Sequence, residues 1–484
     1  MRFGLILAVA CIAQFMVVLD VSVVNVALPT IGRDLHYTST GLQWVVNAYV
    51  LTFAGFLLLG GRAADLFGQK RVFVLGLTIF TGASLAGGFA TSDTWLTAAR
   101  AVQGFGGAIL SPATLTIIVT TFAGPRLARS IGMWSALAGA GGATGALLGG
   151  ILVQELSWRW VLFINVPIGI VLGVMAILYL PEHRRVGEHR PLDTWGAILV
   201  TAGLTATVYG IVNTTTYAWT STRTLVTLGI AAALLVAFVL VETRVVDDPL
   251  VPMRFFKSKT ASGANLVMMF VGAAFFSMWY FLTLFMQDVL GYSALKTGLC
   301  FLPQSVAIIV GAQISSRLMS KVGVWPIVTV GTTLATAGFL LLSNLSIHSS
   351  YATSIMLPSM AVAFALGLLF SPLAAAATST VAPTDAGLAS GILSTSRQVG
   401  GSLGLAVLAT IATSHAVSQV GPLPSPVSAA YHTPANLMAV TSGFNVAFLC
   451  SAGLTFFALV AAVLLRGVYP VRQHSPQVAA APAD

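Results

Sequence analysis

The sequence carries little charge. Only 8% of its 484 residues are Asp, Glu, Lys or Arg, whereas soluble domains carry about 25%. Hydrophobic residues make up 57% of the chain, and no long polar domain interrupts their stretches. A soluble globular fold is therefore excluded, and the composition is typical of an all-α polytopic membrane protein.

Further features that the sequence lacks limit the range of possible functions. The three cysteines, Cys11, Cys300 and Cys450, lie far apart in apolar segments, so they are expected to be core residues rather than metal ligands. No Gly-x-x-x-x-Gly-Lys-Ser/Thr loop occurs, which excludes ATP as an energy source within this chain. No cluster of His, Cys or carboxylates converges at one depth, so neither an enzyme nor a cofactor is expected. The net charge of +9 comes from scattered basic residues, which argues against binding of nucleic acid.

Fourteen segments are long and apolar enough to be membrane-spanning helices. They lie near residues 4–28, 41–60, 71–91, 95–122, 130–153, 161–181, 194–213, 224–243, 262–287, 295–316, 325–344, 353–379, 388–414 and 441–465. The first segment lacks a small-residue cleavage site and contains Asp20, so it is expected to remain as a helix rather than to be removed as a signal peptide.

The basic residues between these segments predict the orientation of the chain. If the first helix starts in the cytoplasm, 17 Lys and Arg residues lie on the cytoplasmic side and only four lie outside. The outside residues are Arg33, Arg159, Arg223 and Lys296. This bias predicts a multi-pass protein of the cytoplasmic membrane with both termini inside, which requires an even number of helices.

Matching motifs indicate an internal duplication. Ser111-Pro112 matches Ser371-Pro372, Gly141 matches Gly400, and the segment 61–68 has a degraded partner at 316–323. The duplication leaves the seventh and eighth segments without partners, so the predicted plan is 6+2+6, as in transporters built from two similar halves. The expected domains are an N-terminal six-helix bundle (1–182), two inserted helices with cytoplasmic linkers (183–259), a C-terminal six-helix bundle (260–470) and a disordered cytoplasmic tail (471–484).

Motifs along the chain then point to a family. They are "LDVSVVNVALP" (19–29), "GRAADLFGQKR" (61–71), "LTAARAVQGFGGA" (96–108), "GGATGALLGG" (141–150) and "WRWVLFINVPIG" (158–169). In this order the sequence resembles the fourteen-helix drug:proton antiporter family of the major facilitator superfamily. The sequence departs from the family pattern at Leu66 and Gln69, where arginines are usual, and at Ala146, where the antiporter motif usually has proline.

The resemblance implies a proton-coupled exporter of amphiphilic drugs or antibiotics that works by alternating access and confers multidrug or antibiotic resistance. A transport-incompetent membrane sensor or scaffold of the same fold, and a proton-coupled importer, remain as alternatives. The expected partners are a small amphiphilic organic substrate, for which a cationic character is one option, together with protons and the lipid bilayer. The chain is expected to act as a monomer, with a proton gradient in place of any cofactor.

Two motifs are candidates for the conformational change. The expected loop with Gly61, Asp65, Gly68, Lys70 and Arg71 is either a cytoplasmic gating latch or a simple turn that obeys the positive-inside rule. Asp65 favours the latch, because an acid adds nothing to that rule. The row of Gly141, Gly145, Gly149 and Gly150 predicts close helix packing, and it resembles the antiporter motif.

A carboxylate within a membrane span costs at least a few kcal/mol, so Asp20 is a functional candidate. Counting residues along the helices places Asp20 and Arg100 at a similar depth. The hypothesis is that Asp20 carries the coupled proton while Arg100, which does not titrate usefully, tunes it. A buried structural ion pair is the alternative.

Four further polar residues are candidates for a substrate cavity. Gln14 and Asn25 lie eleven residues apart and share one face of the first helix. Arg397, followed by Gln398, has no acid at membrane depth in its half of the chain. A substrate anion, a carbonyl group or a water chain would satisfy Arg397, and a hydrogen bond to a broken helix is an equally good alternative.

Overall fold

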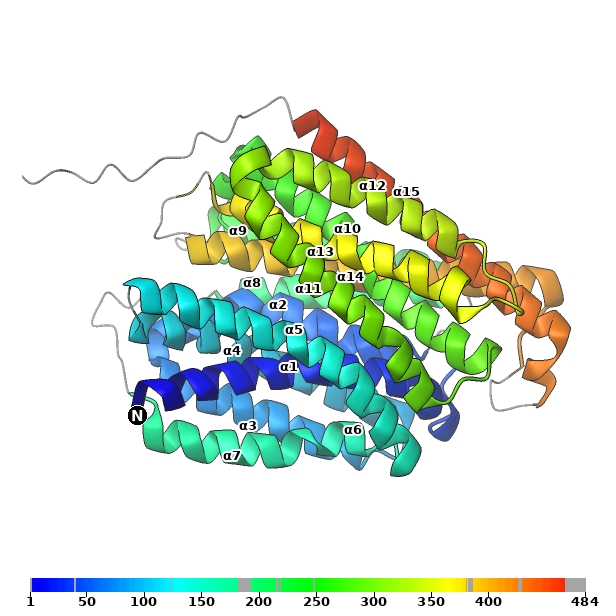
Figure 1. The fold of residues 1–484 in the computed structure, drawn as a ribbon, viewed down its shortest axis with the longest axis horizontal. Helices are drawn as coiled ribbons and strands as arrows, with labels where there is room; N and C mark the ends of the chain where they lie inside the picture. Colours follow the sequence, from blue (N-terminus) through cyan, green and yellow to red (C-terminus); the bar gives the residue numbers. More distant parts are fainter. Residues whose placement is uncertain are drawn as a thin grey trace, which may run out of the picture.

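The computed structural model describes residues 2–38, 41–122, 124–181, 193–214, 217, 219–246, 249–379, 381, 386–424 and 429–465, and their regular elements are helices (Figure 1). The long helices are α1 (Arg2–Asp34), α2 (Trp44–Phe67), α3 (Gln69–Gly88), α4 (Asp93–Thr121), α5 (Gly124–Glu155), α7 (Asn165–Tyr179), α8 (Thr194–Asn213), α9 (Thr222–Arg244), α10 (Lys259–Leu284), α11 (Ala294–Val322), α12 (Val324–Leu342), α13 (Leu357–Thr378), α14 (Ala386–Val420) and α15 (Pro434–Leu465). A short helix, α6 (Trp160–Phe163), precedes α7. The expected tail 471–484 lies outside the described residues.

Thirteen helices in the described part of the chain are long and apolar enough to cross a membrane. They correspond to thirteen of the fourteen expected segments. The remaining segment, 130–153, forms α5, a 32-residue helix that packs along α1 but is not among the thirteen. The all-helical membrane fold is therefore confirmed.

Polar residues set where several helices begin. The side chains of Ser92, Asp193, Ser221, Ser258 and Ser293 each accept a hydrogen bond from a backbone N–H in the first turn of α4, α8, α9, α10 and α11, respectively. Such caps satisfy amides that have no partner within the helix. These residues therefore fix where five helices start.

The helices form two similar halves, α1 to α7 below and α10 to α15 above in Figure 1. In the first half, α5 approaches α1 so closely that a Cβ atom on Gly141 would lie 2.9 Å from the carbonyl oxygen of Phe15. In the second half, α14 approaches α10 in the same way, and a Cβ atom on Gly400 would collide with the carbonyl oxygen of Met269. The matched glycines therefore make equivalent helix contacts, as a duplication predicts.

The connections between the second and third helices of the two halves are also equivalent. Gly68 (φ 95°) separates α2 from α3, and Gly323 (φ 85°) separates α11 from α12. A positive φ favours glycine at both positions. The expected loop from Gly61 to Gly68 is wrong in extent, because α2 continues to Phe67 and Gly68 alone makes the turn. The residues from Arg62 to Phe67 contain no proline and no glycine, so nothing in this stretch interrupts the helix.

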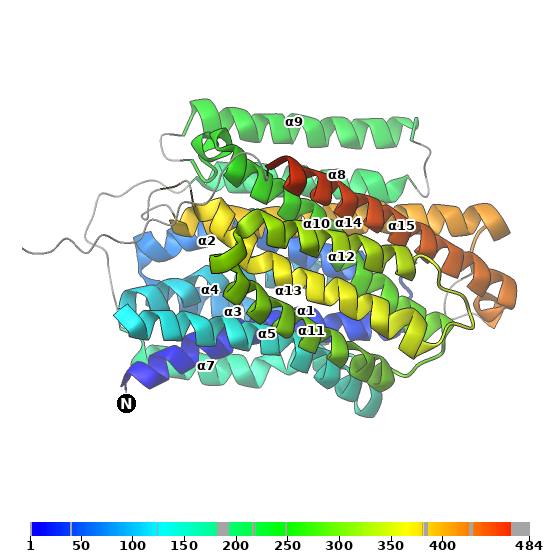
Figure 2. The ribbon, with the colours of Figure 1, turned by 45° about the horizontal axis from the view of Figure 1, so that its top comes forward.

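The inserted helices α8 and α9 form a hairpin on one side of the molecule (Figure 2). Gly203 of α8 meets Leu235 of α9, and Gly210 meets Leu228, so closely that a Cβ atom on either glycine would lie only 2.8 or 2.7 Å from the leucine side chain. On its other side, α8 contacts both α2 and α14, where Leu51, Val208 and Ala406 share one apolar cluster. The hairpin therefore covers the seam between the two halves at α2 and α14.

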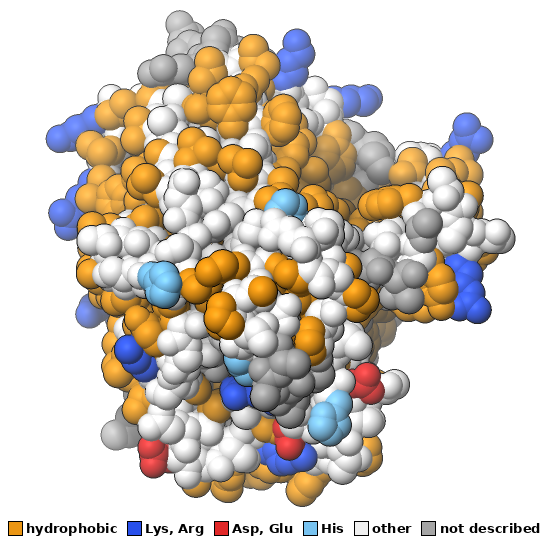
Figure 3. All heavy atoms as spheres, turned by 90° about the vertical axis from the view of Figure 1, so that its right-hand side faces the viewer, with side chains coloured by type: hydrophobic (Ala, Val, Ile, Leu, Met, Phe, Trp, Pro, Cys, Tyr) orange, Lys and Arg blue, Asp and Glu red, His pale blue; other side chains and the backbone are white. Residues whose placement is uncertain are grey.

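We call the end of the bundle where α1 begins and α15 ends the termini face, and the other end the opposite face. The two halves touch near the opposite face. The amide of Gln287 donates to the carbonyl oxygen of Val26 (2.9 Å), and a Cβ atom on Gly298 of α11 would collide with the carbonyl oxygen of Ala146 of α5. Figure 3 looks onto the opposite face, where uncharged polar and backbone atoms fill much of the centre with hydrophobic side chains scattered among them.

Candidate functional site

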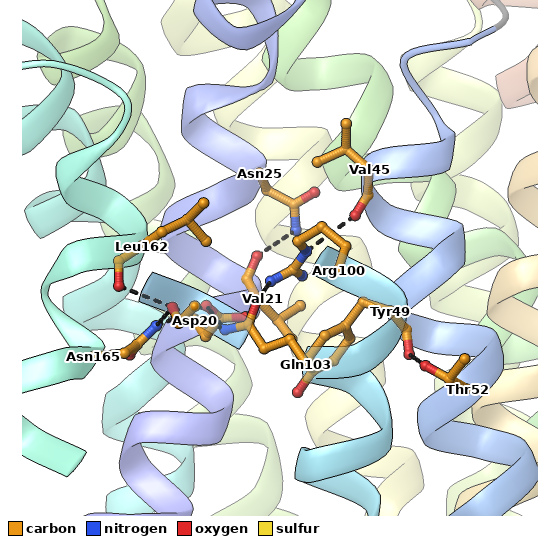
Figure 4. A network of polar contacts seen from close by, with 11 residues as sticks. Asp20, Val21, Asn25, Val45, Tyr49, Thr52, Arg100, Gln103, Leu162 and Asn165 are labelled. Atoms are coloured by element: carbon orange, nitrogen blue, oxygen red, sulfur yellow. Dashed lines mark hydrogen bonds and ion pairs between the residues drawn. The ribbon is translucent and has the colours of Figure 1, made fainter. Parts of the chain in front are cut away.

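Asp20 and Arg100 form an ion pair in the interior. Nη1 of Arg100 lies 2.6 Å from Oδ2 of Asp20, and the two side chains are 2% and 0% exposed, respectively (Figure 4). The similar depth predicted for the two residues is therefore confirmed, and the contact is direct rather than through water. The pairing offsets the cost of placing either charge in the membrane.

Two amides complete the shell of the carboxylate. Gln103 and Asn165 both donate to Oδ1 of Asp20, at 2.8 and 2.9 Å. The same two amide nitrogens also donate to the hydroxyl oxygen of Ser84, which itself donates to the carbonyl oxygen of Leu162 (2.8 Å). All of these polar side chains are buried. Asp20 thereby connects α1 to α4 and α7, and Ser84 adds α3.

The guanidinium of Arg100 is held on several sides. Besides Asp20, it donates to Oε1 of Gln103 (2.7 Å) and, through Nε, to the carbonyl oxygen of Val45 (3.2 Å). Its central carbon lies 4.4 Å from the centre of the Tyr49 ring, a cation–π geometry. These contacts link α4 to α2 and fix the orientation of the cation.

The network lies inside the N-terminal half. The groups that contact Asp20 and Arg100 come from α1, α2, α4 and α7, and none in the described part of the chain comes from α10 to α15. The ion pair therefore faces the other helices of its own half.

Sequence reasoning missed part of this network. Gln103 and Asn165 lie within recognised motifs, but neither was expected to contact Asp20. Ser84 and Tyr49 lie outside those motifs, in helices whose other residues are mostly apolar. The signal that could have identified Ser84 and Tyr49 is a polar residue on the buried face of an amphipathic helix. The sequence of α3 has no strong amphipathic pattern, so Ser84 does not stand out.

The connection between α2 and α3 is described in part. Nζ of Lys70 donates to the carbonyl oxygen of Ile177 at the end of α7 (2.7 Å), so this basic residue ties α3 to α7. Arg71 is exposed, and Gly61 faces Pro112 of α4, which lies 3.5 Å from the position of a Cβ atom on the glycine. The side chain of Asp65 lies outside the described residues.

The glycine motif of α5 packs against two neighbours. Gly141, Gly145 and Gly149 face α1, where a Cβ atom would lie 2.6 to 2.9 Å from the nearest atoms. Gly150 faces α11 of the other half, and its Cβ atom would lie 2.7 Å from the α-carbon of Leu295. The motif thus holds α5 between its own half and the partner half.

The four expected cavity residues are not brought together by any contact among the described residues. Gln14 accepts a hydrogen bond from Ser111 of α4 (2.8 Å), and the amide of Asn25 donates to the carbonyl oxygen of Val21 in its own helix (3.0 Å). Arg397 lies 5.2 Å from the centre of the Phe370 ring. Its Nε atom and Oε1 of Gln398 are buried without a partner in the described part of the chain.

Comparison with known proteins shows which family has this architecture. Residues 10–405 match the family model of the Major Facilitator Superfamily. The chain belongs to the major facilitator superfamily. Its members are transporters, so the chain is a transporter of the membrane rather than an enzyme. The superfamily inferred from the motifs is thereby confirmed.

Two relatives are similar along most of their length. The cephamycin export protein CmcT of Amycolatopsis lactamdurans is 46% identical over 409 residues, which cover 84% of this chain and 84% of that protein. The puromycin resistance protein pur8 of Streptomyces alboniger is 38% identical over 415 residues, which cover 85% of this chain and 82% of that protein.

A solved structure shares the fold. A bacterial homologue of the human lysosomal transporter Spinster, in an inward-facing and unoccupied conformation, superposes with a TM-score of 0.66. The match covers 96% of each chain at 16% sequence identity. This similarity supports the fold alone.

Proposed function

We propose that this chain exports small amphiphilic drugs or antibiotics and that the proton gradient across the cell membrane drives the export. The names of the two relatives, an antibiotic export protein and an antibiotic resistance protein, support the substrate class. The buried carboxylate of Asp20, paired with Arg100 and joined by hydrogen bonds to neighbouring helices, is the observation on which proton coupling rests.

Protonation of Asp20 would change several contacts at once. The charged acid accepts from Arg100, Gln103 and Asn165, whereas a neutral acid no longer offsets the guanidinium charge. Arg100 would then keep only the carbonyl oxygen of Val45, the amide oxygen of Gln103 and the Tyr49 ring. Because Arg100 stays charged, it sets the affinity of Asp20 for the proton without carrying one. Proton binding is thereby coupled to helix packing.

Gating is proposed for the α2–α3 connection. Asp65 would act as the latch near Gly61 and Gly68, and Lys70 anchors the start of α3 to α7. The glycine row of α5 would provide the close, sliding contact with α1 and α11 that alternating access requires.

Substrate binding is proposed for Arg397 and Gln398, with Gln14 and Asn25 as further candidates. Arg397 and Gln398 are the stronger pair, because each holds a buried polar atom that a ligand could satisfy. The hydrogen bonds of Gln14 with Ser111 and of Asn25 with Val21 already use one polar atom of each side chain.

The orientation proposed from the basic residues places the termini face in the cytoplasm. The four basic residues counted outside lie near the opposite face, at the end of α1, just after α5 and at the starts of α9 and α11. Antiport would then exchange external protons for cytoplasmic substrate, without a cofactor.

Purified protein in liposomes tests the proposal. With an acidic lumen, the wild type should accumulate members of a panel that includes a cephamycin and puromycin, whereas Asp20→Asn should only equilibrate them. Asp34→Asn is the matched control, because Asp34 lies on the same helix in a partly exposed ion pair with Arg159. Accumulation by Asp20→Asn at the wild-type level would remove Asp20 from the coupling mechanism.

A further inference from the structure

A second pair of acids lies buried at the termini face, in the inserted hairpin. Asp193 at the start of α8 is 4% exposed, and Glu242 near the end of α9 is 3% exposed. Each uses one oxygen to accept from a backbone amide: Oδ1 of Asp193 from Gly196 (2.7 Å), and Oε2 of Glu242 from Val251 (3.1 Å). Asp193 thus caps α8, and Glu242 holds the segment that follows α9.

The other two oxygens lie around the same glycine, Gly196, and no donor among the described residues reaches them. Oδ2 of Asp193 and Oε1 of Glu242 are both buried, and neither has a hydrogen-bond partner in the described part of the chain. Both lie beside the α-carbon of Gly196, where a Cβ atom would collide with Oδ2 of Asp193 and lie 2.9 Å from Oε1 of Glu242. A proton between these two acceptors would stabilise them, because two adjacent ionised carboxylates repel strongly away from water.

Arg62, on α2, is a cation whose charge acts on Glu242, and the side chain of Arg254 lies outside the described residues. Nη1 of Arg62, on α2, points to the carbonyl oxygen of Pro249 (3.4 Å), and Arg244 at the end of α9 is exposed. Lys257, in the segment after α9, is exposed as well. The charged residues of 183–190, together with Asp247 and Asp248, lie outside the described residues. The ion pairs described above join Arg100 to Asp20 and Arg159 to Asp34, and neither includes an acid of the hairpin.

The acid pair stands next to the seam between the halves. Val251, whose amide binds Glu242, packs in an apolar cluster with Leu58 of α2 and with Ala389 and Ile392 of α14. The segment after α9 therefore bridges the two halves at the termini face. Glu242 of α9 holds this segment by accepting from the amide of Val251, and Asp193 at the start of α8 lies beside Glu242 at Gly196.

We propose that Asp193 and Glu242 bind one shared proton, which locks the inserted hairpin to the bridging segment at Val251. Loss of this proton places two negative charges against Gly196, so Glu242 turns away and releases the amide of Val251. The site is separate from Asp20, which lies in α1 within the N-terminal half. It senses the pH on the termini side, whatever the transported substrate.

Infrared difference spectroscopy of the purified full-length protein tests the shared proton. Between low and high pH, the wild type should lose a carbonyl band of a protonated acid that is missing from both Asp193→Asn and Glu242→Gln. Asp20→Asn and Glu155→Gln, which alter a buried acid elsewhere and an exposed acid, should keep this band. A band that persists in both hairpin variants would overturn the proposal.

Hydrogen exchange tests the lock. After correction for the intrinsic pH dependence of exchange, the amide of Val251 should lose protection as the pH rises in the wild type. Asp193→Asn should keep it protected at every pH, because asparagine still caps α8 and its amide donates permanently to Glu242. Equal protection of Val251 at all pH values in the wild type would refute the lock even if the shared proton exists.

Discussion

A double-mutant cycle on Asp20 and Arg100 would measure how strongly the buried ion pair is coupled. Asp20→Asn leaves the guanidinium without its counter-charge, 4.4 Å from the centre of the Tyr49 ring and with 2% of its side chain exposed. Arg100→Gln leaves the carboxylate with its two amide donors, Gln103 and Asn165. The double variant replaces both charges by neutral amides in the same space.

The expected free energies of unfolding differ sharply between these variants. Each single substitution strands a buried charge and should cost about 3–5 kcal/mol, with Arg100→Gln at the lower end because two donors remain. The double variant loses no more than a few hydrogen bonds, each with a net value of about 1 kcal/mol, so it should cost about 2–3 kcal/mol. The coupling energy should therefore exceed about 3 kcal/mol, which is more than a hundredfold in the unfolding equilibrium.

Unfolding by a denaturing detergent, followed with a thiol-reactive dye, provides the measurement. Cys11 and Cys300 are 2% and 8% exposed, so both report the loss of packing. The partly exposed pair of Asp34 and Arg159 (3.4 Å) is the control, with an expected coupling below about 1 kcal/mol. Equal coupling in the two cycles would refute the buried electrostatic network as described.

Three further predictions concern packing, gating and topology. Gly298→Val should prevent the close approach of α11 to Ala146 of α5 and keep the opposite face open. An impermeant thiol reagent should then label an engineered cysteine at this contact more than in the wild type, and unchanged labelling would contradict the contact. Asp65→Asn should slow transport several-fold but preserve substrate affinity in a binding assay; a loss of affinity would instead place Asp65 in the substrate path. A single cysteine at Pro422 should react from outside intact cells, and a lack of reaction there would reverse the proposed orientation.

The sequence predicted the membrane fold and the meeting of Asp20 with Arg100, because residue count fixes depth along a helix. It did not predict which way the pair faces. Asp20 turns towards α4 and α7 rather than towards the other half, and this direction depends on the rotation of α1 set by glycine contacts with α5. Helix rotation is a tertiary property that hydropathy does not encode.

Other features had weaker signals in the sequence. The motif around Gly61 suggested a loop, but a glycine at φ < 0 is compatible with a helix, and only Gly68 has the positive φ that ends α2. The pairing of Asp193 with Glu242 joins residues 49 positions apart in the chain, at the hairpin's open end. Gly196, Gly203 and Gly210 are spaced seven residues apart, and they contact Glu242, Leu235 and Leu228 of α9, respectively. This regular spacing of glycines is the signal in the sequence that indicates how α8 packs along α9.

The position of the hairpin makes the two sides of the transporter unequal towards lipid. On one side, α8 shields the boundary of α2 and α14, and α9 turns outward with only 11% of its apolar stretch buried. On the other side, α5 and α11 meet directly through Gly150 and Gly298, and no described helix covers them. The boundary between the halves on this second side is therefore closed by direct packing of α5 against α11, which glycine permits at two positions because a hydrogen atom stands where other residues carry a side chain.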